Sequence, residues 1–393
     1  MVTREASEIL VIGAGLAGAA CARALARGGF QVTVVEANSK PAMGASGNPL
    51  AIVHALFSKD HNRASRWLDQ GMLRSMAWAR DLQVAHGVCG VLQLAQSAQE
   101  DLDWQRPESA LIEYWNKDRV ADFLQGHATP HPFGGLWCGQ GGWVVPSDFV
   151  SRCLKDARDH GAGLRLDTAV VSVDFTQRCA KLNNGGEIFF QQIVFCAAQD
   201  TDQLIPDAQL TLNGLRGSVS EFDCSELLNA ENKMGLPAVV CAQGYATPLV
   251  GGRMVVGAGY ERLGESTVLS NEISNRDRLQ QISPVLGDLC SRLPSNDRTS
   301  IRSATLDRLP LVGQILDWRR PLAASVSQLH QMPRLPHAWI CGGLGSRGVS
   351  SAALAAECIT AMIKGGPSPI APDLVKAVDP VRFALRRHQR RQA

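Results

Sequence analysis

Three glycines near the start of the chain have the spacing of a nucleotide-binding turn. Gly13, Gly15 and Gly18 form the pattern GxGxxG. In such a turn the first glycine permits a tight bend, the second lets backbone approach a pyrophosphate, and the third lets a helix pack closely on a strand. Glu36 lies downstream, where an acid accepts hydrogen bonds from a ribose. That acid argues against a 2′-phosphate, so the motif predicts FAD or NAD rather than NADP.

The segments around these glycines predict the elements that would position the turn. Residues 8–13 are a short apolar run ending in glycine, as a buried parallel strand does. Residues 16–28 show helical spacing of small apolar residues, and 31–36 read as a second strand. Together they predict a βαβ unit, with the pyrophosphate at the helix N-terminus.

The rest of the sequence mixes helices and strands, which is typical of an α/β protein. Apolar periodicity predicts an amphipathic helix over 63–86, and Ser147 is the expected N-cap of a helix over 147–160. Strands over 214–222 and 254–260 are expected in a separate antiparallel sheet. The other expected elements are strands over 169–175, 180–182, 187–198 and 337–343, a glycine turn over 345–348 and a helix over 349–364.

Composition narrows the class of protein. The chain has 393 residues, of which 45% are apolar, and a net charge of +2, so no global field indicates a nucleic-acid partner. Its 11 cysteines include no CxxC pair and no zinc-finger spacing, so we expect reduced thiols and no metal. The apolar stretch 9–26 is interrupted by glycines and Arg23, which argues against a signal peptide or membrane span. A cytoplasmic protein is therefore expected.

Four motifs in order carry a resemblance to a known family. They are MGASGN at 43–48, GGWVVP at 141–146, IRSATLDRLPLVG at 301–313 and GLGSRG at 343–348. Together they resemble the D-amino-acid-oxidase (DAO) superfamily of flavoenzymes. More narrowly, they are similar to the FAD-dependent oxidoreductase half of the MnmC family, whose bifunctional enzymes modify the wobble uridine of tRNA. The resemblance runs from about residue 8 to residue 387.

The resemblance implies a fold and a domain organisation. It implies an α/β protein with a Rossmann-like FAD-binding domain and a second, mainly antiparallel-sheet substrate domain, of DAO or glycine-oxidase type. The expected FAD-binding domain comprises 1–85, 142–212 and 300–380, the substrate domain 86–141 and 213–299, and a basic tail 381–393.

The resemblance also implies a reaction. FAD would oxidise a C–N bond in the substituent of 5-carboxymethylaminomethyl(-2-thio)uridine, releasing glyoxylate and leaving the aminomethyl group. In the bifunctional family a methyltransferase domain precedes this half; here the flavin-binding strand begins at once, so only the oxidative step is expected. Ala51, Ala55 and Gln199 depart from the family pattern of glycine, proline and glycine. They put fine flavin contacts in question.

Arginines are the expected anchors for the substrate carboxylate. An arginine grips a carboxylate through two parallel N–H bonds, which fixes orientation as well as affinity. In related glycine-type oxidases, arginines at the motif positions of Arg302 and Arg347 hold the carboxylate; a structural salt bridge is the alternative. Arg308 is a third candidate. Tyr245 and Tyr260 either line the substrate side or lie in the core with satisfied hydroxyls.

The flavin ring is expected against the second glycine turn. Backbone N–H groups of 345–348, with Ser346 as N-cap, would stabilise charge at flavin N1 and O2. His54 near the flavin loop is interpreted as packing. The expected cofactor-binding residues are Gly13, Gly15, Leu16, Ala17, Gly18, Glu36, Ala37, Gly44, Ala45, Ser46, Asn48, Gly345, Ser346 and Gly348.

The expected partners are the tRNA anticodon region and a separate methyltransferase. The basic run 382–391 would contact phosphates or form a solvated tail, and Trp137 or Trp143 would stack on a splayed base or pack in the core. Two other functions stay open. One is a free amino-acid oxidase or dehydrogenase of glycine or D-amino-acid type, and the other is a tRNA-binding flavoprotein without catalytic activity.

Overall fold

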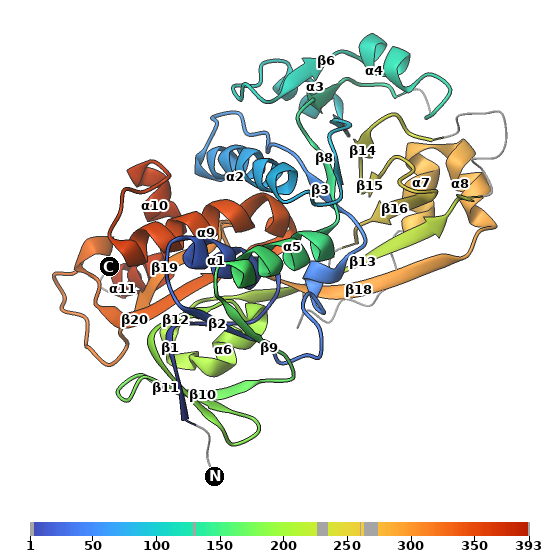
Figure 1. Ribbon diagram of the computed structural model, residues 1–393. Coiled ribbons are helices and arrows are strands. Elements are labelled where there is room, and N and C mark those ends of the chain that lie inside the picture. The colour runs from blue at the N-terminus through green and yellow to red at the C-terminus, as the bar shows by residue number, and fades with distance from the viewer. Residues whose placement is uncertain (1–3, 129–130, 226–234, 260, 263–273, 392–393) are drawn as a thin grey trace.

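A computed structural model describes residues 4–128, 131–225, 235–259, 261–262 and 274–391, so Tyr260 lies outside the described residues. A sheet with a parallel core occupies one half of the molecule (Figure 1). β1 pairs in parallel with both β2 and β12, β2 with β9, and β12 with β20. Its strands are β1 (Arg4–Ile12), β2 (Val32–Val35), β9 (Gly163–Arg165), β10 (Val170–Asp174), β11 (Cys179–Leu182), β12 (Glu187–Phe195), β19 (Leu311–Leu316) and β20 (Arg334–Gly342).

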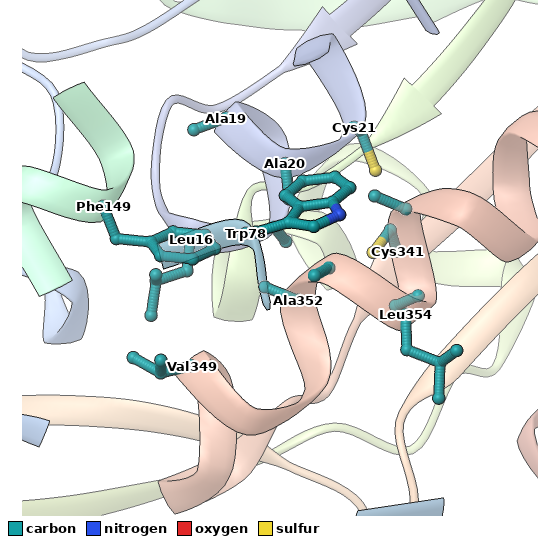
Figure 2. Packing of buried hydrophobic residues seen from close by; sticks show 14 of the residues in the cluster. Leu16, Ala19, Ala20, Cys21, Trp78, Phe149, Cys341, Val349, Ala352 and Leu354 are labelled. Atoms are coloured by element: carbon teal, nitrogen blue, oxygen red, sulfur yellow. The ribbon is translucent and has the colours of Figure 1, made fainter. Parts of the chain in front are cut away.

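Four helices lie on one side of this sheet (Figure 1). They are α1 (Leu16–Arg27), α2 (Arg63–Asp81), α5 (Pro146–Asp159) and α9 (Gly348–Lys364), with α2 packed on α9 rather than on the strands. Figure 2 shows their apolar side chains meeting, with Trp78 of α2 stacked on Phe149 of α5 at 6.4 Å between ring centroids. The expected βαβ unit is confirmed, because β1, α1 and β2 follow one another with β1 and β2 parallel. On the opposite face lies α6 (Thr201–Leu204) (Figure 1).

A second, mainly antiparallel sheet forms the other half of the molecule. The strands expected over 214–222 and 254–260 are present as β13 (Asn213–Asp223) and β16 (Arg253–Gly257), which pair with one another in antiparallel orientation. β13 also pairs along ten positions with β18 (Ser295–Ala304), so the expected domain boundary at residue 300 falls inside a strand. The sheet's other strands are β5 (Val91–Leu94), β6 (Glu113–Trp115), β7 (Gly135–Cys138), β14 (Val239–Cys241), β15 (Tyr245–Ala246) and β17 (Glu261–Arg262).

Shorter elements complete the fold. A small sheet of β3 (Ala51–Val53), β8 (Gly142–Val144) and β4 (His86–Gly87) lies between the two larger ones (Figure 1). The remaining helices are α3 (Ala98–Trp104), α4 (Lys117–Leu124), α7 (Asn275–Ile282), α8 (Pro284–Ser291), α10 (Pro372–Val378) and α11 (Arg382–Arg390). All eleven cysteines are free thiols.

Two expected helix ends were wrong. The helix predicted over 63–86 ends at Asp81, because Gln83 adopts a left-handed φ of 54° and the Val84 N–H bonds back to the Ala79 carbonyl at 2.8 Å. This is a Schellman ending without the usual glycine. Ser147 is not an N-cap: α5 begins one residue earlier, at a proline whose fixed φ suits the first helical position.

The basic run at the C-terminus is a packed helix. Arg382 of α11 is 4% exposed and its guanidinium pairs with Asp307, with Nη2 to Oδ1 at 2.8 Å. Arg387 donates to the Thr211 hydroxyl at 2.7 Å. The alternative of a solvated tail is therefore wrong for these two arginines, because both guanidiniums are bound within the fold. Arg390 and Arg391 are exposed.

Candidate active site

A cavity of about 980 Å³ lies where the parallel strands end and the second sheet begins. The ends of β1, β2, β12 and β20 all contribute to its wall, which is where ligands bind in open α/β sheets. Its size is at the upper end of ligand pockets, about 300–1,000 Å³. Among the expected site residues, those lining it are Gly13, Gly15, Leu16, Ala17, Glu36, Ala37, Gly44, Ala45, Ser46, Asn48, Tyr245, Arg302, Gly345, Ser346, Arg347 and Gly348.

The first glycine turn leaves no space for side chains. Gly13 has φ +98°, and a Cβ there would lie 2.8 Å from the Cys196 carbonyl oxygen. Gly18 does not line the cavity; a Cβ on it would lie 1.8 Å from the Gly13 oxygen, so it provides close packing as expected. The α1 N–H of Leu16 donates to Ser46 Oγ at 3.0 Å, and the first turn of α1 contains no acid. This helix end is a suitable anion site.

Glu36 is a buried hydrogen-bond acceptor at the end of β2. It is 8% exposed, and its Oε2 accepts the Ala14 N–H at 2.7 Å. Its Oε1 accepts the backbone N–H of Asn38 at 3.0 Å and the side-chain amide of the same residue at 2.6 Å. A carboxylate offers about four acceptor positions, so one remains on Oε2 for a ribose hydroxyl. The carboxylate thus both fixes the turn and retains capacity for a nucleotide.

The second glycine turn is held by contacts with α2. Residues 345–347 form a 3-10 turn, Gly345 has φ +56°, and α9 begins at Gly348. The Ser75 hydroxyl donates to the Val349 carbonyl at 2.6 Å, anchoring the first turn of α9. Ser346 is not the N-cap that was expected: that position is Arg347, and its side chain makes no capping bond. The first turn of α9, also without an acid, borders the cavity with its N–H groups.

Gly217 provides the space that Arg302 occupies. Arg302 of β18 is 6% exposed and lines the cavity. A Cβ at Gly217 on the neighbouring β13 would lie 1.7 Å from Arg302 Nη1. In the same way, a Cβ at Gly257 would lie 3.1 Å from the ring carbon Cζ and the hydroxyl of Tyr245. Neither glycine was predicted from the sequence, although a glycine inside a strand often marks such a close approach.

His54, interpreted from the sequence as packing, lines the cavity. Its Nδ1 lies 2.7 Å from the Ala55 carbonyl oxygen. Burial lowers the pKa of His54 to about 4, and the nearby charge of Arg347 acts in the same direction. Burial raises the pKa of Cys241 to about 12, although Arg347 opposes that shift. At neutral pH, Arg347 therefore has an uncharged imidazole and an uncharged thiol as neighbours.

Two buried polar atoms on the cavity wall test whether a polar ligand fits. Gln199 Oε1 and Ser303 Oγ have no hydrogen-bond partner among the residues that the structure describes, and both residues line the cavity. Buried polar atoms normally have a partner, so these two indicate a ligand or water in the cavity. Together with the glycine turns and Glu36, they fit a dinucleotide.

Three residues considered for binding lie elsewhere. Arg308 is exposed, and neither it nor Trp143 lines the cavity. Trp137 stacks on Trp115 with 4.5 Å between ring centroids, so the alternative of packing holds for Trp137. Within the described ranges no cluster of His, Cys, Asp and Glu is arranged to hold a metal ion. No described helix has both the length and the apolar character to cross a membrane.

Comparison with known proteins identifies the family. The model of the FAD-dependent oxidoreductase family DAO matches residues 8–362. The chain belongs to the DAO family. It is 32% identical over 410 residues to the tRNA 5-methylaminomethyl-2-thiouridine biosynthesis bifunctional protein MnmC of Cupriavidus necator, covering 96% of this chain. A protein of the same name from Azoarcus is 32% identical over 393 residues. This DAO-family chain spans 60% of the length of each.

Solved structures of DAO-type enzymes share the fold. Glycine oxidase from Geobacillus kaustophilus superposes with a TM-score of 0.76 at 17% identity, covering 96% of this chain and 99% of that one. L-proline dehydrogenase from P. horikoshii also has a TM-score of 0.76 at 17% identity, with 97% and 99% covered. The expected α/β fold with an FAD-binding and an antiparallel part is thus confirmed, and FAD is the cofactor of the family.

Proposed function

We propose that this DAO-family protein oxidises the carboxymethyl C–N bond of 5-carboxymethylaminomethyl(-2-thio)uridine at the tRNA wobble position. Loss of a hydride and a proton from the –NH–CH₂–COO⁻ group gives an imine. Addition of water to that imine, followed by cleavage of its C–N bond, yields 5-aminomethyl(-2-thio)uridine and glyoxylate. The observation that carries the proposal is similarity to MnmC proteins along 96–98% of this chain.

The cavity offers the groups that such a substrate requires. Arg302 and Arg347 both line it, and each can bind a carboxylate through two parallel N–H bonds. Arg302 is buried, where a charge-assisted bond is stronger than in water. We therefore assign the substrate carboxylate to these two arginines and place the α-carbon deeper in the cavity, beside Tyr245.

FAD, when bound, supplies the electron acceptor for the hydride of the α-carbon. The residues of this protein bind the cofactor, orient the substrate and stabilise the charge that develops on the flavin ring. The turn after Gly13 and the α1 N-terminus would hold the diphosphate, and Glu36 a ribose. The N–H groups and dipole at the start of α9 would stabilise negative charge on the reduced ring. These assignments agree with the lack of acids in the first turn of either helix.

The proposed partners follow from the same relatives. The name of these relatives describes a bifunctional protein of 5-methylaminomethyl-2-thiouridine biosynthesis. Methylation of the aminomethyl product of oxidation would give that methylaminomethyl group. We propose that the anticodon region of tRNA delivers the wobble base to the cavity, and that a methyltransferase consumes the product. We retain the division into FAD-binding and substrate domains as part of this proposal.

The experiment is mass analysis of wobble nucleosides from tRNA carrying the carboxymethylaminomethyl group, before and after incubation with FAD-loaded protein. We expect conversion to the aminomethyl nucleoside together with release of glyoxylate. Arg347→Ala should raise the apparent KM strongly, whereas substitution of Arg308, an exposed arginine in the motif that contains Arg302, by alanine should not. Faster turnover of glycine, sarcosine or D-alanine than of this tRNA would favour a free amino-acid oxidase. Binding of tRNA without flavin bleaching would indicate a non-catalytic protein.

A further inference from the structure

A neutral histidine lies on the cavity wall near the proposed carboxylate anchor. His54 directly follows β3 and lines the same cavity as Arg302 and Arg347. We propose that His54 Nε2 accepts a hydrogen bond from the substrate amine and so orients the C–N bond that is oxidised. The inference rests on the proposed oxidation of an amine beside a carboxylate, and it adds a residue that recognises the nitrogen of that amine.

The hydrogen bonding of the ring assigns its two nitrogens. A backbone carbonyl only accepts hydrogen bonds, so Nδ1, at 2.7 Å from the Ala55 oxygen, must carry the proton that it donates. The imidazole is uncharged at neutral pH, and a neutral ring has one proton. Nε2 is therefore a lone-pair acceptor. Among the residues that the structure describes, none forms a hydrogen bond with Nε2.

The neighbourhood of His54 matches an α-amino carboxylate. β3, which His54 directly follows, packs against α9, whose N-cap residue is Arg347. The charge of Arg347 also lowers the pKa of His54, as expected for neighbouring side chains. In the group –NH–CH₂–COO⁻, a single carbon separates the nitrogen from the carboxylate. A carboxylate bound by Arg347 therefore brings the N–H of the amine within reach of an acceptor beside that arginine. Cys241, the other uncharged neighbour of Arg347, is a protonated thiol and only a weak acceptor.

An uncharged acceptor suits this place better than an acid. A carboxylate here would pair with the arginines and compete with the substrate carboxylate for them. An uncharged imidazole neither pairs with the arginines nor competes with the substrate carboxylate. Because its pKa is low, it accepts a hydrogen bond from the amine N–H without removing the proton. The hydrogen bond from the amine to His54 Nε2 restricts rotation about the C–N bond. The nitrogen lone pair can then align with the C–H bond that breaks. His54 thus distinguishes an amine from an ether or hydrocarbon of the same shape.

The experiment compares two ligands that cannot be oxidised because they lack an α C–H bond. They are 2-aminoisobutyrate and pivalate, which differ only in an amino group against a methyl group. Their dissociation constants from FAD-loaded protein are measured by perturbation of the flavin absorbance. His54→Phe removes the acceptor and keeps a ring, whereas His54→Gln restores an acceptor oxygen. His86→Phe is the matched control, since His86 makes the same Nδ1 contact with a carbonyl at 2.7 Å but does not line the cavity.

We expect His54→Phe to reduce the preference for 2-aminoisobutyrate over pivalate about tenfold, the effect of one hydrogen bond. His54→Gln should recover most of that preference, and His86→Phe should leave it unchanged. An unchanged preference in His54→Phe, or equal losses for both ligands, would overturn the proposal. A His54-dependent preference in a protein that leaves modified tRNA unaltered would reject the tRNA substrate and retain the role of His54.

Discussion

Replacing Gly217 with alanine is expected to displace Arg302 without changing any charge in the cavity. The added Cβ would lie 1.7 Å from Nη1 and 2.8 Å from Cζ of Arg302. Ordinary contact begins at 3.4 Å, so Nη1 must move by at least about 1.7 Å. Backbone cannot relieve the clash easily, because the same Cβ would also lie 3.0 Å from the Gly259 carbonyl oxygen. The guanidinium therefore leaves the position from which we propose it binds the carboxylate.

The size of the effect follows from the bonds that Arg302 would lose. Hydrogen bonds to charged groups contribute about 1.5–3 kcal/mol each. Loss of one or two in the transition state is then worth about 1.5–6 kcal/mol, or about 10- to 10⁴-fold in kcat/KM. The backbone of Gly217 lies outside the left-handed region, so alanine is conformationally acceptable there. The loss should therefore appear in catalysis more than in folding.

The assay is a double-mutant cycle on kcat/KM, with flavin content and unfolding midpoint as checks on the fold. If Gly217 acts only through Arg302, Gly217→Ala should cost nothing further in an Arg302→Ala background. Gly163→Ala is the matched control, because it adds a Cβ to another strand glycine with no atom nearer than 4.0 Å. A loss below twofold in Gly217→Ala, or additive losses in the double variant, would refute this reasoning.

Three further predictions concern other parts of the molecule. Glu36→Ala should weaken FAD binding about tenfold or more, since it removes a ribose acceptor and a brace of the turn; fluorescence titration of apoprotein with FAD measures this, and an unchanged affinity would contradict the assignment. His54 has a pKa of about 4 in the folded protein against 6.5 in the unfolded state, so the unfolded state binds more protons between those values. The free energy of unfolding should therefore fall as pH drops from about 6.5 to about 4, by about 2–3 kcal/mol for this residue. Denaturant unfolding of wild type and His54→Gln at both pH values tests this prediction. An equal pH dependence in the two proteins would count against the prediction. Arg382→Ala should lower the free energy of unfolding by about 3 kcal/mol because it leaves Asp307 without its buried partner, whereas the exposed Arg390→Ala should not, as urea titration would show.

Local sequence was sufficient where the structure depends on neighbours along the chain. The βαβ unit could be predicted because strand, glycine turn and helix follow one another along the chain. The strand and the helix each have a characteristic apolar pattern, and the turn has its glycine spacing. The end of α2 could not, since the left-handed residue is Gln83 and apolar spacing continues to the buried Val84. The basic run misled for a related reason. Its composition gives no sign that Asp307 would pair with Arg382 across the fold.

In the candidate site, too, residues that depend on local sequence could be predicted, and residues that depend on tertiary neighbours could not. The nucleotide-binding residues were predictable from spacing, and Arg302 and Arg347 from motifs that resemble a family. Gly217 was not identified and His54 was interpreted only as packing, because the role that we propose for each depends on what lies opposite it in space. Gly217 is meaningful only once β13 is paired with β18, and His54 only once β3 is placed beside the turn that contains Arg347.

The two glycine turns are distant in sequence, yet the helices that follow them pack against one another. α1 and α9 pack directly on one another, and Figure 2 shows Leu16 and Val349, from their first turns, on the same side of this core. A Cβ on Gly348 would lie 3.1 Å from Leu16 Cδ1, so this helix pair permits little further bulk. The diphosphate site and the ring and carboxylate site therefore share one rigid support. A substitution that separates α1 from α9 should affect FAD affinity and substrate binding together, whereas one at Gly217 should affect substrate binding alone.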